Sequence, residues 1–144
     1  MAATHFSGPV ISAAGFQEGT AAVNTIAAAT TLTADDSGKI HFLNAAGGAA
    51  VTLPAPVAGM KFRFVVAAAF ATTDWTIVTN ASANIIQGGA DVNGTYTPAS
   101  NEDTITFVST LETLGDYVEL VTDGTNWFVE GAAGGALGIT FTAT

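Results

Sequence analysis

The sequence predicts an all-β fold: an antiparallel β-sandwich or jelly-roll-like body preceded by an extended N-terminal arm. Short runs of β-branched and aromatic residues recur along the chain, and turns rich in glycine, asparagine, aspartate or proline separate them. Within several runs, apolar residues alternate with other residues, as they do in half-buried strands. A regular succession of such short strands is typical of sandwiches and barrels.

Residues 1–25 differ from the rest and are expected to form the arm. Large apolar residues occur there without helical spacing, and Gly8, Pro9 and Gly15 interrupt them. Apolar side chains on an arm need cover, either from the arm's own domain or from a groove on a neighbouring subunit, and the sequence leaves both open. The residues expected to contact a partner are Phe6, Pro9, Val10, Ile11 and Phe16.

Residues 26–144 are expected to form the sandwich body. In residues 40–43, Ile40 and Phe42 alternate with His41, which places His41 on the polar-facing side of its strand. In residues 60–66, Lys61 and Arg63 are expected on the face opposite the core. The other strands are expected at 25–33, 50–53, 74–79, 84–87, 104–109, 116–122, 126–130 and 138–142.

The turn residues support this assignment independently. Asn93-Gly94 and Asp123-Gly124 each lie between two apolar runs, and such pairs accept the positive φ that tight hairpins require. Residues 35–38 form a further expected turn, and Pro54 ends the strand before it because proline cannot donate to a ladder. Residues 131–138 are rich in glycine and alanine and predict a flexible C-terminal tether. The last strand on it could pair with its own sheet or with another subunit.

The charge balance restricts the partners. The chain has a net charge of −9 with only three lysines and arginines, too few for a basic stripe that would neutralise phosphates, so no nucleic-acid partner is expected. No apolar run is long enough to cross a membrane, and the opening residues carry no secretory signal pattern. Charged residues make up only 10% of the chain, which indicates surfaces of small polar residues or faces covered by partners.

The sequence predicts no catalytic residues, no metal site and no cofactor. There is no cysteine, the two histidines lie far apart in the sequence, and the spacing of Glu112 and Asp116 in a turn does not form a general acid and base pair. Trp75 and Trp127 alternate with aliphatic residues and are expected in the core. The alternative for them, and for the two tyrosines, is a sugar-stacking platform.

Four segments carry a resemblance to a known class of proteins. They are residues 4–10 (THFSGPV), 34–38 (ADDSG) leading to Leu43-Asn44, 51–56 (VTLPAP) with Gly59 and Phe62, and 115–118 (GDYV) through 123–127 (DGTNW). Together they resemble small structural proteins of tailed bacteriophages, including capsid cement or decoration proteins. The segments at 51–56 and 123–127 are also similar to pieces of phage tail-fibre and baseplate modules.

The resemblance implies a non-enzymatic virion protein that binds the major capsid protein on the outer surface of the shell and stabilises the capsid. It also implies a homo-oligomer, commonly a trimer, made in the bacterial host cytoplasm. The alternative is a tail-fibre or spike module that binds a host surface glycan. A chain poor in charge and rich in short strands agrees with adhesion between proteins.

Overall fold

The computed structural model describes residues 23–143 and consists of strands and short turns. Among these residues, two short 3-10 turns occur, η2 (Ala34–Asp36) and η3 (Asn80–Ser82). The strands are β1 (Val23–Ile26), β2 (Thr30–Thr31), β3 (Ile40–Leu43), β4 (Ala50–Thr52), β5 (Lys61–Val66), β6 (Trp75–Val78), β7 (Ile86–Val92), β8 (Thr95–Glu102), β9 (Thr104–Phe107), β10 (Tyr117–Thr122), β11 (Trp127–Ala133) and β12 (Ile139–Thr142).

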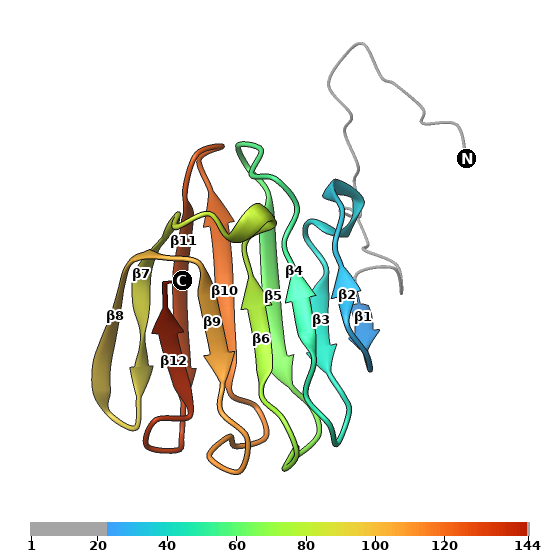
Figure 1. Cartoon of the computed structure of the whole chain (residues 1–144), viewed down its shortest axis with the longest axis vertical. Helices are drawn as coiled ribbons and strands as arrows, with labels where there is room; N and C mark the ends of the chain where they lie inside the picture. The colour runs from blue at the N-terminus through green and yellow to red at the C-terminus, as the bar shows by residue number, and fades with distance from the viewer. Residues whose placement is uncertain (1–22, 144) are drawn as a thin grey trace, which may run out of the picture.

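The strands form two sheets that pack face to face (Figure 1). The seven-stranded sheet has the order β1-β3-β5-β10-β11-β7-β8, and the five-stranded sheet has the order β12-β9-β6-β4-β2. Each sheet packs one face against the other sheet and turns its second face outward. The predicted all-β sandwich is therefore confirmed.

The first half of the chain winds around the sandwich. Strands β1 to β6 alternate between the two sheets, so a strand's neighbour in its own sheet follows one full circuit later and runs in the same direction. The sheets are therefore mixed, whereas the sequence analysis predicts antiparallel pairing. Parallel neighbours need a long connection, and here the strand in the opposite sheet provides it in place of a helix.

The second half contains the predicted hairpins. β7 and β8 pair antiparallel across Asn93 and Gly94, whose φ angles of 53° and 78° are the left-handed values that a tight turn needs. β10 and β11 pair antiparallel across the turn that contains Gly124, with φ of 98°. Asp123 Oδ1 accepts hydrogen bonds from the backbone N–H groups of Thr125 and Asn126 in this turn. Both hairpin predictions are confirmed.

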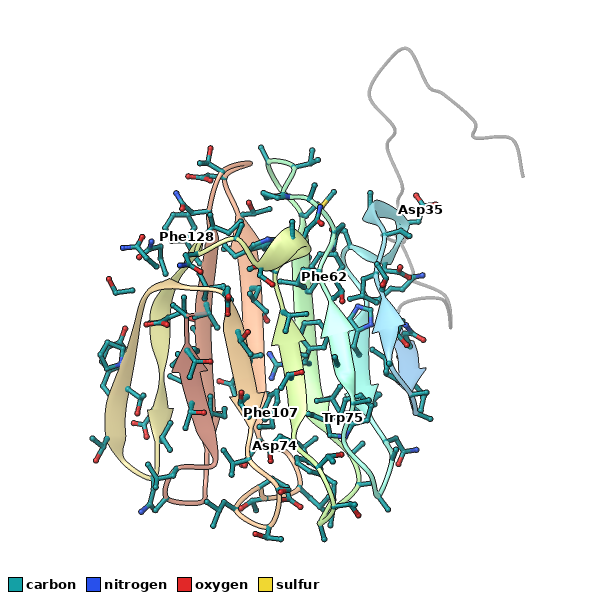
Figure 2. All side chains as sticks on the ribbon, viewed as in Figure 1. Asp35, Phe62, Asp74, Trp75, Phe107 and Phe128 are labelled. Carbon is teal, nitrogen blue, oxygen red and sulfur yellow. The ribbon has the colours of Figure 1, made fainter. Side chains whose placement is uncertain are left out.

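The core lies between the sheets and is built from the inward side chains of both. Trp75 and Phe107 lie side by side in neighbouring strands (Figure 2). Phe62 packs against Trp127 with ring centroids 5.6 Å apart. These four side chains are fully buried. Burying one large side chain of this kind stabilises a fold by roughly 1.5–3 kcal/mol, so this aromatic set is a main source of stability.

Two expected boundaries differ from the structure. β1 begins at Val23 and pairs with β3, so residues 23–25 belong to the body and not to an arm ending at residue 25. The segment expected as a tether also begins later than residue 131. Gly131 and Ala132 continue β11, and a Cβ at Gly135 would collide with the backbone oxygen of Leu111. The run of glycine and alanine at residues 131–138 therefore reflects close packing against a neighbouring loop. The last strand, β12, pairs with β9 of its own chain.

Candidate functional site

The residues predicted for partner contact cannot be placed. Phe6, Pro9, Val10, Ile11 and Phe16 lie outside the described residues, and their role stays a prediction. The two outer faces of the sandwich are the surfaces that the described residues offer to a partner. They differ strongly in chemistry.

The outer face of the five-stranded sheet carries almost only threonine. Inward residues such as Val51, Ile77 and Ile105 are buried, so the residues that alternate with them point outward. We call this surface the threonine face. It consists of Thr31, Ala50, Thr52, Thr76, Val78, Thr104, Thr106, Thr140 and Thr142.

The strand register arranges the threonine face in two rows across the sheet. Threonines of β6, β9 and β12 lie opposite one another in one row, and those of β2, β4, β9 and β12 share the other row with Val78. Neighbouring strands lie about 4.8 Å apart and alternate residues about 6.7 Å apart, so the rows form a regular grid of hydroxyl and methyl groups. No charged residue belongs to either row.

The outer face of the seven-stranded sheet is mixed. Exposed apolar side chains on it include Val23, Val121 and Phe128, with Val23 49% exposed. Charged side chains from β5, β10 and β11 lie between them, and Arg63, Glu119 and Glu130 are register neighbours. This face therefore has both apolar and ionic contacts to offer.

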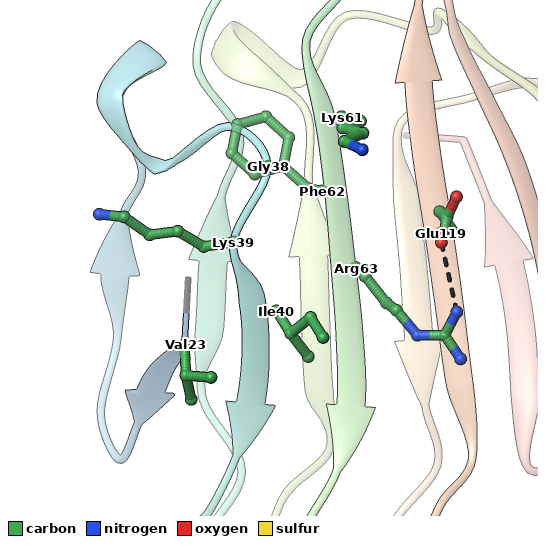
Figure 3. Close-up of a pocket in the computed structure, with 8 residues that line it drawn as sticks. All are labelled: Val23, Gly38, Lys39, Ile40, Lys61, Phe62, Arg63 and Glu119. Atoms are coloured by element: carbon green, nitrogen blue, oxygen red, sulfur yellow. Dashed lines mark hydrogen bonds and ion pairs between the residues drawn. The ribbon is translucent and has the colours of Figure 1, made fainter. Parts of the chain in front are cut away.

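A hollow of about 330 Å³ lies on this mixed face, between β1 and β10 (Figure 3). The residues that line it are Val23, Gly38, Lys39, Ile40, Lys61, Phe62, Arg63 and Glu119. All three lysines and arginines of the whole chain are among them. The winding of β1, β3 and β5 brings these residues together from separate segments, and we call the site the basic hollow.

Two of the three cations in the basic hollow have counter-ions. Lys39 Nζ lies 2.9 Å from Asp36 Oδ1, and Arg63 lies 3.3 Å from Glu119 Oε2 and stacks over the Tyr117 ring at 4.3 Å. Figure 3 shows the Arg63 side chain extending to Glu119. Burial alone would raise the pKa of Asp36, but hydrogen bonds from Thr33 and the contact with Lys39 outweigh it and lower that pKa below its usual value.

Among residues 23–143, Lys61 has no such counter-ion. Within residues 23–143 no ion pair involves Lys61, although it points to the same outer face as Arg63. Gly38 lies across from it in the lining and contributes no side chain, which leaves the hollow open. The prediction that Lys61 and Arg63 face away from the core is confirmed.

Two carboxylates in the loop between β9 and β10 bind backbone groups. Asp116 accepts hydrogen bonds from the N–H groups of Thr113 and Gly134, and Glu112 Oε1 accepts one from the Phe70 N–H. Each carboxylate joins a loop to a neighbouring segment.

His41 points into the core, so the expected polar-facing position is wrong. It is fully buried, stacks on Phe64 at 5.1 Å, and accepts a hydrogen bond at Nδ1 from the Asn24 amide. Nε2 then carries the proton and, within residues 23–143, meets no acceptor at full hydrogen-bond geometry. Burial lowers the pKa of His41, and the side chain is neutral. In the described residues, no three histidine, aspartate or glutamate side chains gather closely enough for a metal ion.

The aromatic residues do not form a sugar platform built on tryptophan. Trp75 and Trp127 are fully buried, as expected for core residues, and their indole faces are not available for stacking. Tyr96 is 64% exposed, but its hydroxyl donates to the Gly88 carbonyl at the sheet edge. This exposed ring stands apart from both tryptophans.

The sequence analysis missed the threonine face, although the signal is present. Threonine alternates with Ile105 in β9 and with Phe141 in β12, and an outward row of uncharged residues follows from that alternation. The basic hollow leaves no comparable signal because Lys39 lies just before β3 and Lys61 begins β5, so the two lysines come from separate segments.

Comparison of the chain with protein families, curated proteins and solved structures finds no match. No helix within residues 23–143 is long and apolar enough to cross a membrane. The proposals below therefore depend on the residues and on the two outer faces.

Proposed function

We propose that this chain is a capsid cement protein of a tailed bacteriophage. It binds the outer surface of the major capsid protein shell through protein contacts and stabilises the shell as a homotrimer. The observation that supports this proposal best is the threonine face, a wide surface that carries no charge in its rows.

Three physical properties suit the threonine face to a broad protein contact. Because it carries no ion, covering it requires no desolvation of a charge. Threonine is branched at Cβ and holds few rotamers, so ordering its side chains on binding costs little entropy. Its hydroxyl groups can donate to or accept from a partner's backbone, which gives directional contacts in addition to methyl packing.

The distribution of charge supports the same orientation. The acidic excess of −9 lies outside the two threonine rows. A subunit that turns its threonine face to the shell keeps its acidic groups in water, where they resist nonspecific association. Three such faces in one trimer multiply a weak contact because the second and third contacts form at a high effective concentration.

The location is tested by image reconstruction of intact particles of the phage that encodes the chain. We expect density for the sandwich on the outer shell, with the five-stranded sheet toward the capsomers. Density at the tail, or on the shell with the threonine face toward solvent, contradicts the proposal.

Single charges on the threonine face provide a second test. Thr76 lies on β6, the middle strand of the sheet, and a Thr76→Lys variant would bury an unpaired charge in the contact. Burying such a charge costs about 3–5 kcal/mol, so occupancy on stripped shells should require at least about 100-fold more protein. The matched control is Thr95→Lys, which changes an exposed threonine of β8 in the other sheet and should bind normally.

The alternative function, a tail-fibre or spike module that binds a glycan, gains no specific support. Its expected platform used Trp75, Trp127 or the two tyrosines; both tryptophans are buried, the exposed Tyr96 ring stands at the sheet edge, and Arg63 covers the Tyr117 ring. The reconstruction described above also separates it from the cement function.

A further inference from the structure

We propose that the basic hollow is the seat of the chain's own N-terminal segment, with Glu18 paired to Lys61 and Phe16 packed on Val23 and Ile40. The proposal commits to the segment of the same copy. It is independent of shell binding, and it gives Phe16 an anchoring role in place of the partner contact expected from the sequence.

The chemistry of the hollow defines its occupant. Val23 and Ile40 provide exposed apolar lining, and Lys61 provides a cation without a counter-ion among the described residues. The occupant must therefore present an apolar group and a carboxylate close together. A bare anion supplies the negative charge but no apolar group, and an apolar chain supplies the apolar group but no charge.

Residues 1–22 contain one such combination. Glu18 is their only acidic residue, and Phe16 lies two positions before it. In an extended segment, residues two apart point to the same side, so a ring and a carboxylate there face one surface together. The hollow and this pair of residues are complementary in both charge and polarity.

The strand register brings the segment to the correct end of the hollow. β1, β3 and β5 run parallel, and Val23, Ile40 and Arg63 are register partners across them. Lys61 precedes Arg63 by two residues, so the chain that precedes Val23 starts from the side of the sheet where Lys61 lies. The parallel winding thus directs the segment toward Lys61 and away from the opposite end of β5.

The reach is sufficient. Five peptide steps join Glu18 to Val23, and an extended chain covers about 3.3 Å per step, or about 16 Å in total. β5 is the second strand from β1, and strands about 4.8 Å apart place it about 10 Å away. The Glu18 carboxylate can therefore meet Lys61 Nζ without any change in β1.

Zero-length carbodiimide coupling tests the contact on the full chain. The reagent joins a carboxylate to an amine only when the two touch, so we expect an amide between Glu18 and Lys61 in peptides identified by mass spectrometry. The Asp36 and Lys39 pair, 2.9 Å apart, serves as the internal positive control. If the control pair couples and Glu18 does not couple to Lys61, the proposal is wrong.

Isotope mixing separates the same copy from a neighbouring one. In an equal mixture of ¹⁴N and ¹⁵N chains, a contact within one copy gives only peptides of a single isotope. Peptides that join ¹⁴N to ¹⁵N would assign the hollow to a sister subunit's segment and overturn the proposal.

Charge exchange provides the last control. Glu18→Lys and Lys61→Glu each place like charges together and should abolish the coupling, whereas the two substitutions combined restore an opposite pair and should restore it. Lys61 is exposed on the outer face of β5, and unchanged fluorescence of the two buried tryptophans verifies folding of each variant. A double variant that fails to couple contradicts the pairing of these two residues.

Discussion

Asp116 provides a direct test of how the loops are held to the sheets. The residue is 5% exposed, and its two carboxylate oxygens accept from the Thr113 N–H at 2.8 Å and the Gly134 N–H at 2.9 Å. It thereby ties the turn before β10 to the turn after β11. An Asp116→Ala substitution removes both acceptors at once.

The expected loss follows from these contacts. A hydrogen bond to a charged group contributes about 1.5–3 kcal/mol, so two of them set an upper range of about 3–6 kcal/mol. Thr113 and Gly134 are exposed, so water can replace part of the hydrogen bonding that their N–H groups lose. We therefore expect Asp116→Ala to lower the free energy of unfolding by about 2–4 kcal/mol.

The matched control is Asp123→Ala. Asp123 also accepts two backbone N–H groups, each at 2.8 Å, but it is exposed, and these hydrogen bonds lower its pKa without any burial. We expect only a small loss of stability there. Denaturant unfolding followed by the fluorescence of the buried Trp75 and Trp127 measures both variants. Equal losses for the two variants would refute the argument that burial makes the Asp116 contacts strong.

Two further predictions concern His41 and the C-terminal turn. The pKa of His41 is lowered from 6.5, so below about pH 6.5 the unfolded chain takes up a proton that the folded chain does not. As the pH falls from 6.5 toward the pKa of His41 in the folded chain, this proton uptake should lower the free energy of unfolding by up to about 1.4 kcal/mol per pH unit; above pH 6.5 it should have no effect. A His41→Phe variant should lack this pH dependence when the free energy of unfolding is measured below pH 6.5. Gly135→Ala should loosen β12 because its Cβ meets the Leu111 oxygen, and hydrogen exchange of the β12 amides should accelerate. Gly47→Ala, where a Cβ meets nothing within 4 Å, should leave that exchange unchanged.

The turns and most strands could be predicted because their signals are local. Asn93-Gly94 requires left-handed backbone angles whatever the rest of the fold does, and the positive φ values in the structure agree. The alternation in β5 also reports its buried face correctly, because Lys61 and Arg63 have a strong preference for water. In these segments, the residues alone contain enough information.

The prediction for β3 failed because its alternation is ambiguous. Ile40 and Phe42 are apolar, but so is Leu43 on the opposite face, and a strand of four residues offers no further positions to decide. The aromatic rings of Phe62 and Phe64 favour a stacked imidazole inside, and those rings come from the next parallel strand. The orientation of His41 is therefore determined by packing against a neighbouring strand, which the sequence of β3 alone does not reveal.

The parallel winding was missed for a related reason. A period of two identifies which side chains share a face, but it does not identify the sheet that a strand joins. Strands 25–33 and 40–43 look like successive members of one antiparallel sheet, whereas β2 crosses to the other sheet between β1 and β3. The basic hollow exists only because of this crossing, which makes it invisible to local analysis.

The winding also makes the two ends of the sandwich unequal. At one end, the edge strands β8 and β12 of the two sheets contact each other, while β1 and β2 are the edge strands at the other end (Figure 1). An open edge with an exposed Val23 invites pairing with other chains unless something covers it. A segment anchored by Glu18 and Phe16 would cover the exposed apolar side chains of Val23 and Ile40 beside this edge. The threonine face would then remain the surface available to a partner, so the two proposals assign complementary roles to opposite faces of one sandwich.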